Sequence, residues 1–220
     1  MKVVVFSLVK DRPEITRQSF NSLYEKTKTP FTHVILDQGS NPRFEKWDEH
    51  QLVVRLEENI GIGAGTNRVL DFIDGDYDVA VKFDNDCVVI DDGAIDECID
   101  LVHTFQRVVC SPYVDGLVHN KGGSPRVKNM HFGSRLFGVT NHIGGIVTVA
   151  SKKAWGDFGR HATPAPLHGN QDSEFSSKLR SLGYTFGYLE MVRVLHSDSE
   201  HNQHNPEYWS KRKLEKITYG

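Results

Sequence analysis

The sequence lacks several features that would place the protein in common functional classes. No apolar run approaches membrane-spanning length, and Lys10 already interrupts the apolar N-terminus. Lys and Arg number 26 against 29 Asp and Glu, so the chain has no overall basic excess of the kind found in nucleic-acid-binding proteins. The three cysteines form no C-x-x-C pair, which favours buried, reduced thiols. These absences predict a soluble, cytoplasmic protein without a transmembrane segment.

The first half of the chain alternates apolar runs with helical patterns, which is typical of a parallel sheet with crossover helices. The expected strands cover residues 2–9, 32–36, 51–56, 78–83 and 107–111, and the expected helices cover residues 13–26, 63–73 and 92–105. This pattern predicts an α/β fold whose nucleotide-binding half comprises residues 1–111.

The regular alternation is lost after Ser111. The later expected elements are strands at residues 145–150, 184–189 and 191–195, a helix at residues 171–182, and a short helix at residues 206–216. We expect residues 112–195 to form an acceptor-binding and catalytic half, followed by a polar tail at residues 196–220.

An acidic triplet, Asp84-Asn85-Asp86, follows the apolar strand expected at residues 78–83. Open α/β sheets bind ligands beyond the carboxyl ends of their strands. Side chains alternate along an extended chain, so Asp84 and Asp86 point the same way and can share a divalent cation that neutralises a diphosphate. A D-x-D triplet is also common in solvated turns, so the triplet by itself leaves both interpretations open.

Three segments before the triplet favour its interpretation as part of a ligand site. They are Ser7-Leu8-Val9 in the opening strand, Asp37 at the end of the second strand, and a glycine-rich segment containing Asn59, Gly61 and Asn67. Together with the triplet they resemble the inverting glycosyltransferases of the GT-A fold, family 2, although the family's Pro-x-Tyr-Asn sequence is absent. The glycines are equally compatible with a simple helix entry.

This resemblance implies a single compact domain with a Rossmann-like mixed sheet flanked by helices. It implies a nucleotide-diphosphate-sugar donor, with a UDP-sugar as the first expectation. The residues of those three segments, together with Asp84 and Asn85, are then donor contacts, and Asp37 recognises the nucleobase.

The second half contains segments that resemble the acceptor side of the same family. Gly144 and Gly145 match its small-residue segment, and Gln171 and Asp172 match the segment that carries its catalytic base. Inverting transfer needs such a carboxylate to remove a proton from the acceptor hydroxyl. The alternatives are a tight turn for the glycines and a helix N-cap for Asp172.

The resemblance also implies a metal ion. Asp84, Asp86 and His196, the last at the end of a strand, are its expected ligands, and an imidazole suits Mn²⁺ better than Mg²⁺. A lone histidine is also commonly structural or solvated.

The segment from Gly116 to Gly156 contains no Asp or Glu but six basic residues. It could form a loop that closes over the donor, or it could attract an anionic acceptor such as DNA, a phosphate polymer or a lipid phosphate. The acceptor itself is not identified by the sequence.

The function predicted from the sequence is metal-dependent, inverting transfer of a sugar to an acceptor hydroxyl. The alternatives are a nucleotidyltransferase of similar fold, a non-catalytic binding module, and a glycosyltransferase that acts on a modified base in DNA.

Overall fold

The computed structural model describes residues 1–117, 123–162 and 171–197. One mixed sheet runs through all of them, in the order β3-β2-β1-β4-β9-β6-β10-β8-β7, with β5 paired to β10. The strands are β1 (Val3–Val9), β2 (Phe31–Gln38), β3 (Gln51–Leu56), β4 (Val79–Phe83), β5 (Cys87–Val89), β6 (Val108–Asp115), β7 (Arg126–Phe132), β8 (Arg135–Thr140), β9 (Val147–Ser151) and β10 (Thr185–His196). The helices are α1 (Pro13–Lys26), α2 (Ile62–Ile73), α3 (Ala94–Thr104), α4 (Lys152–Phe158) and α5 (Gln171–Ser181).

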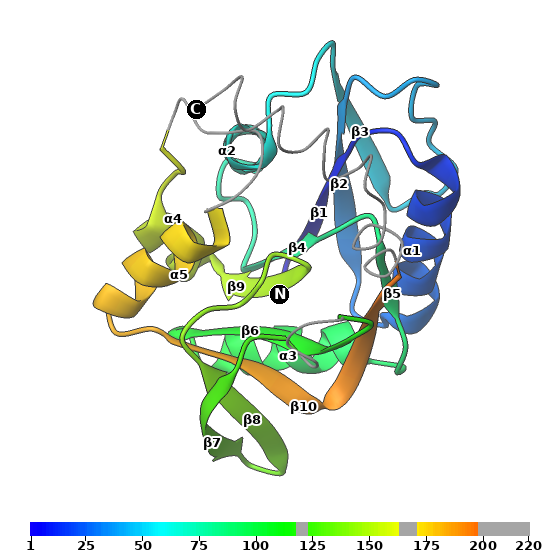
Figure 1. Cartoon of the computed structure of the whole chain (residues 1–220). Helices are drawn as coiled ribbons and strands as arrows, with labels where there is room; N and C mark the ends of the chain where they lie inside the picture. The colour runs from blue at the N-terminus through cyan, green and yellow to red at the C-terminus, as the bar shows by residue number, and fades with distance from the viewer. Residues whose placement is uncertain (118–122, 163–170, 198–220) are drawn as a thin grey trace.

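The parallel part of the sheet creates a ligand site through its connectivity. The chain runs outward from β1 to β2 and β3, then returns through α2 to β4 on the other side of β1, and β1 pairs in parallel with both β2 and β4. The carboxyl ends of β1 and β4 therefore lie side by side where the strand order reverses (Figure 1). Ligands of open α/β sheets bind at this kind of switch point.

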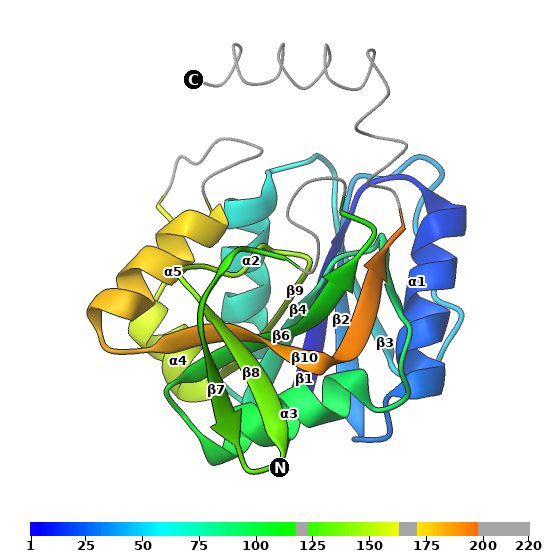
Figure 2. The same ribbon diagram turned by 60° about the horizontal axis from the view of Figure 1, so that its bottom comes forward.

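Helices cover both faces of the sheet. Figures 1 and 2 show α1 on one side, and α2, α4 and α5 together on the other. Pro13 begins α1, as its fixed φ angle favours, and Gly65 lets α2 approach β1 because a Cβ there would lie 3.2 Å from the Leu8 side chain. The core consists mainly of apolar residues of the central strands and of the inward faces of the helices. Among the described helices, none is long and apolar enough to cross a bilayer.

The cysteines agree with the prediction. Cys87, Cys98 and Cys110 are free thiols in the core, each without exposed surface.

The second half of the chain contains elements that the sequence patterns did not predict. The hairpin β7–β8 and the helix α4 are additional, as is the short strand β5 in the first half. The two strands expected at residues 184–189 and 191–195 form one continuous strand, β10, whose pairing with β6 shifts register between Leu189 and Arg193. The helix expected at residues 206–216 lies outside the described residues.

Candidate active site

Asp84 lies just beyond the carboxyl end of β4. Its backbone N–H donates to the Ile146 carbonyl at 2.9 Å, which ties this loop to the segment before β9. Its Oδ1 accepts a hydrogen bond from the Lys82 ammonium at 2.5 Å. Desolvation raises the pKa of Asp84 to about 6, with Lys82 opposing the shift and the Asp86 charge adding to it. A bound cation would favour the charged form of this carboxyl group.

Asp86 is held by side chains from two other elements. The guanidinium of Arg12, a residue in the left-handed conformation before α1, lies 3.2 Å from Oδ2. Nε2 of His196 lies 3.5 Å from Oδ1. The register of β5 and β10 explains the second contact, because His196 pairs with Cys87, the residue after Asp86. Residues far apart in the sequence thus meet at the end of β4.

Asp172 is the second residue of α5, and its carboxylate faces the loop before β9. Its Oδ2 accepts from the Gly145 N–H at 2.9 Å. Phe175, one turn further along α5, packs against Trp155 and Phe158 at ring distances of 4.7 and 4.9 Å and so fixes the helix. The contact with Gly145 shows that the carboxylate bonds to another segment, which the alternative of a simple N-cap does not require.

Lys82 is a site residue that the sequence motifs did not identify. Its ammonium donates to the Gly145 carbonyl as well as to Asp84. The residue is 7% exposed. The available signal is a lysine inside an otherwise apolar strand of five residues, two positions before an aspartate.

The predicted metal ligands provide oxygen and nitrogen donors that suit Mn²⁺ or Mg²⁺. Asp86 and His196 are in contact, and Asp84 keeps 37% of its side chain exposed. Within residues 1–117, 123–162 and 171–197, no three His, Cys, Asp or Glu side chains form a group that could hold a metal by itself. The described residues therefore form no complete metal site on their own, and the role of Asp84, Asp86 and His196 as metal ligands stays a prediction.

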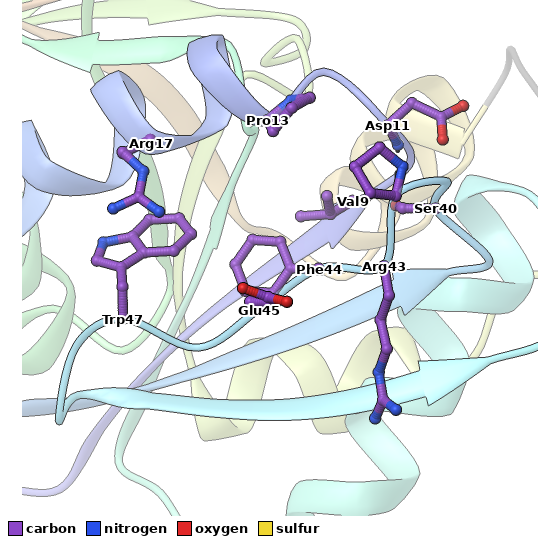
Figure 3. Close-up of a pocket in the computed structure, with 10 residues that line it drawn as sticks. Val9, Asp11, Pro13, Arg17, Ser40, Arg43, Phe44, Glu45 and Trp47 are labelled. Atoms are coloured by element: carbon purple, nitrogen blue, oxygen red, sulfur yellow. Dashed lines mark hydrogen bonds between the residues drawn. The ribbon is translucent and has the colours of Figure 1, made fainter.

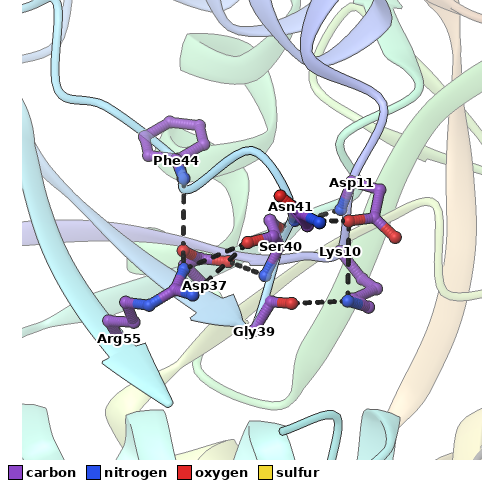
Figure 4. Close-up of polar contacts among 8 residues, drawn as sticks. All are labelled: Lys10, Asp11, Asp37, Gly39, Ser40, Asn41, Phe44 and Arg55. Atoms are coloured by element: carbon purple, nitrogen blue, oxygen red, sulfur yellow. Dashed lines mark hydrogen bonds and ion pairs between the residues drawn. The ribbon is translucent and has the colours of Figure 1, made fainter. Parts of the chain in front are cut away.

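Asp37 is fully buried, and its carboxylate accepts hydrogen bonds from other residues of the protein (Figure 4). Its carboxylate accepts from the N–H groups of Ser40 at 2.9 Å and Phe44 at 3.3 Å, and from the guanidinium of Arg55. Burial acts to raise the pKa of Asp37, but these hydrogen bonds outweigh it and lower the pKa below the ordinary value. In this structure Asp37 shapes the loop after β2.

A pocket of about 230 Å³ lies between this loop and α1. It is lined by Val9, by Phe44 and Trp47, and by Arg17, whose guanidinium stacks 4.4 Å from the Trp47 ring centroid (Figure 3). Ser40, one of the residues held by Asp37, also lines it. The pocket thus combines aromatic faces with charges of both signs, from Arg17 and Arg43 and from Asp11 and Glu45, next to the carboxyl ends of β1 and β2.

Several other predicted donor residues have their side chains engaged inside the protein. Ser7 is buried and bonds to the Phe83 carbonyl at 2.5 Å, Leu8 packs against the core, and Asn85 donates to Thr16 at 2.8 Å. Asn59 accepts from the Gly61 N–H at 2.9 Å. These residues build the walls of the site, and their contact with a donor stays a prediction.

Asn67, Gly144 and Gln171 lie around the predicted base. Asn67 clamps the backbone of His161 through hydrogen bonds of 2.9 and 3.0 Å. The N–H of Gly144 donates to the Tyr188 hydroxyl at 3.3 Å, and Gln171 is buried beside Asp172 in a small cavity. The donor contact of Asn67 and the acceptor-side role of Gly144 and Gln171 stay predictions.

Three basic residues of the acid-free segment, residues 116–156, form ion pairs, two of them with other elements and one within α4. Arg126 pairs with Glu190 at 2.6 Å, and Lys153 pairs with Asp157 at 2.9 Å. Arg135 pairs with Glu97 and Asp100 at 2.6 and 2.7 Å. Within the part of the chain that the structure describes, Arg126, Arg135 and Lys153 are therefore each paired with an acid that lies outside residues 116–156.

The family model of glycosyl transferase family 2 matches residues 4–151, which include the switch point and the acidic loop. The chain belongs to glycosyl transferase family 2. The match confirms the family resemblance drawn from the motifs. No curated protein sequence matches the chain.

Solved structures of the GT-A fold are similar to this family 2 chain. GalNAc-T7 with UDP, GalNAc and Mn²⁺ matches with a TM-score of 0.69 and 13% identity, over 89% of this chain and 43% of that one. The mannosyltransferase PcManGT from Pyrobaculum calidifontis, in complex with GDP-Man and Mn²⁺, gives 0.68 and 12%, over 98% and 61%. S. aureus TarS 1-349 in complex with UDP-GlcNAc gives 0.64 and 14%, over 98% and 65%. This chain thus spans 43 to 65% of their lengths, and at these identities the likeness confirms the fold.

Proposed function

We propose that the protein is a metal-dependent, inverting glycosyltransferase that moves a sugar from a nucleotide-diphosphate donor to an acceptor hydroxyl. The observation that carries this proposal is the placement of Asp172 beside the acidic loop at the sheet's switch point, linked to Asp84 through Gly145 and Lys82. A proton acceptor next to a diphosphate-binding end of an α/β sheet is what inverting transfer requires.

The donor's diphosphate would lie at the carboxyl ends of β1 and β4. Asp84, Asp86 and His196 would hold the cation there, and the cation would neutralise the charge of the leaving nucleotide diphosphate. Arg12 brings a fixed positive charge to the same place through its contact with Asp86. The Mn²⁺ in the structures of GalNAc-T7 and PcManGT supports this assignment.

The nucleobase would bind in the pocket beside Val9, because Phe44 and Trp47 offer faces on which a flat ring can stack. Asp37 would contribute indirectly, by holding Ser40 and Phe44 in position. UDP is the first expectation, supported by the UDP and UDP-GlcNAc in two of the similar structures.

Asp172 would accept the proton of the acceptor hydroxyl as that oxygen attacks the anomeric carbon, from the side opposite the diphosphate. It lies in the first turn of α5, whose packing against α4 fixes its place. The Gly145 N–H occupies Oδ2 and orients the group. The attack inverts the anomeric configuration because the nucleotide leaves from the other face.

Nucleotide binding and turnover test the proposal separately. Thermal shift with UDP, GDP, CDP and dTDP, each with and without Mn²⁺, should show one nucleotide that stabilises the protein only with the metal. A free nucleotide concentration of 100 times Kd should stabilise the folded protein by about 2.7 kcal/mol, which raises Tm by roughly 5 to 10 °C. Stabilisation by none of the four would refute donor binding.

The variant Asp172→Asn should bind the selected nucleotide normally but release nucleotide from its sugar conjugate about 10² to 10⁴ times more slowly. Asp157→Asn, a change in the neighbouring helix α4, is the matched control and should retain full rate. Full activity of Asp172→Asn would refute its role as base. Pyrophosphate release from a nucleoside triphosphate would instead support a nucleotidyltransferase, and binding without any turnover would support a binding module.

A further inference from the structure

Lys82 is unusual because it is a buried lysine in a central strand of the sheet. All five residues of β4 are buried, and the other four are apolar. A buried cation costs several kcal/mol unless anions and hydrogen-bond acceptors surround it. The environment of Lys82 must therefore contain partners that compensate for this cost.

These partners come from two sides of the active site. The ammonium donates to Asp84 Oδ1 at 2.5 Å and to the Gly145 carbonyl. Asp172 lies close enough for its charge to attract the ammonium as well. Lys82 thus lies between the carboxylate of the acidic loop and the predicted base.

The Gly145 peptide connects the two. Its carbonyl accepts from Lys82, and its N–H donates to Asp172 Oδ2 at 2.9 Å. A Cβ at Gly145 would lie 2.5 Å from Asp172 Oδ1, so the carboxylate packs directly on this peptide. The following residue, Ile146, accepts from the Asp84 N–H at 2.9 Å. The position of Asp172 is therefore defined relative to the acidic loop through one short segment of backbone.

We propose that Lys82 is a positioning residue, which holds the Gly145 peptide and Asp84 together and thereby sets the place of Asp172 relative to the donor. This proposal rests on the role of Asp172 given above. Without the ammonium, the charges of Asp84 and Asp172 repel each other with no cation between them, and the Gly145 carbonyl loses its donor. Asp172 then shifts away from the acceptor hydroxyl, while the nucleobase pocket between α1 and the loop after β2 is unchanged.

The test compares Lys82→Met, Asp172→Asn and the double variant, with Lys128→Met on the exposed edge strand β7 as the matched control. The kinetic readout is nucleotide release from the conjugate of whichever nucleotide stabilises the wild type. Lys82→Met should lower kcat by about 100-fold, since a misplacement near 1 Å has that effect, and should change nucleotide affinity by less than about tenfold. The double variant should be no slower than Asp172→Asn within about threefold, because the two residues act through one link.

The structural readout is hydrogen exchange of the Gly145 amide. In Lys82→Met this amide should exchange at least about tenfold faster than in the wild type, because its bond to Asp172 is loosened. Gly145→Ala disturbs the same link without changing any charge, so it should reproduce the loss of kcat and be non-additive with Lys82→Met. This variant also serves if Lys82→Met does not fold.

Three results would overturn the proposal. They are multiplicative losses in the double variant, an unchanged Gly145 amide, and a loss of nucleotide affinity as large as the loss of kcat, which would make Lys82 a donor ligand. If the wild type binds no nucleotide, the proposed function fails on its own, and the exchange measurement still decides whether Lys82 holds the segment.

Discussion

A buried histidine on β2 should make the stability of the protein strongly dependent on pH. His33 has no exposed surface and bonds through Nε2 to Ser7 at 2.9 Å and through Nδ1 to Tyr24 at 2.8 Å. Ser7 donates its own proton to the Phe83 carbonyl, so it accepts from Nε2–H, and Nδ1 accepts from the Tyr24 hydroxyl. Both ring nitrogens are thus satisfied in the neutral form only.

The magnitude follows from the pKa of His33. Burial, with a smaller contribution from the charge of His50, lowers the pKa from 6.5 to about 3. Between these values the unfolded chain binds a proton that the folded protein does not, so stability falls as the pH decreases below 6.5. At pH 4.5 this effect amounts to about 3 kcal/mol relative to pH 7.5, at 1.36 kcal/mol for each tenfold ratio.

Urea unfolding of the wild type and His33→Gln between pH 4.5 and 7.5 measures this contribution. The amide of Gln can keep a donor toward Ser7 but does not titrate. The variant should be less stable at pH 7.5, and this deficit should shrink by about 3 kcal/mol at pH 4.5. Comparing the two proteins cancels the contributions of their other titratable groups.

Tyr24→Phe is the control, because it removes the Nδ1 partner but keeps the buried ring. It should be destabilised, yet retain most of the wild type's dependence on pH, since burial is the largest cause of the lowered pKa. A stability difference between wild type and His33→Gln that is constant across this pH range would refute the reasoning.

Two further predictions concern buried polar contacts. Arg55→Met leaves the carboxylate of Asp37 buried without its cation. The variant should lower the free energy of unfolding, measured by urea titration, by about 3 to 5 kcal/mol. A loss below about 1 kcal/mol would contradict the assigned contact. Tyr188→Phe removes the hydroxyl that accepts from the N–H groups of both Ser124 and Gly144. The variant should lower the free energy of unfolding by about 1 to 3 kcal/mol and speed hydrogen exchange at those two amides. Unchanged exchange would contradict the role of the hydroxyl.

The parallel half of the fold could be predicted closely because its central strands β1, β2 and β4 are largely buried on both faces. Such strands appear as continuous apolar runs, and proline marks the start of a helix. The prediction for residues 13–26 coincides with α1, and that for residues 51–56 coincides with β3.

The antiparallel half was harder to predict because its strands carry polar residues on exposed faces. β7 is an edge strand with exposed Val127, Lys128 and Asn129, so it lacks an apolar run. The helix α4 is hidden among charged residues, although Ser151 marks its start by accepting from the Ala154 N–H at 3.1 Å. The strand β10 bends where its register shifts, which the sequence pattern shows as two separate strands.

The same contrast explains the active site. Asp84, Asp86 and Asp172 stand in short motifs whose spacing along the chain identifies them. Lys82 and the Gly145 peptide act through contacts between β4 and the loop before β9, and only the sheet order brings those segments together. A motif therefore identifies the candidate reacting groups, while the groups that are proposed to position them follow from the topology.

The acid-free segment shows why a local count of charges overstates a local electric field. Arg126, Arg135 and Lys153 lie in a stretch without acids, yet each is paired in the folded protein: the two arginines with acids of other elements, and Lys153 with Asp157 one turn further along α4. Paired charges attract a polyanion weakly, because its phosphates would have to compete with carboxylates already in place. In the described residues this segment therefore acts mainly as a support, through Arg126 on Glu190 and Arg135 on α3. At the switch point Arg12 and Lys82 are paired in the same way, with Asp86 and Asp84. A diphosphate proposed to bind there would therefore depend on the cation that these carboxylates are proposed to hold, because the two basic side chains already have carboxylate partners.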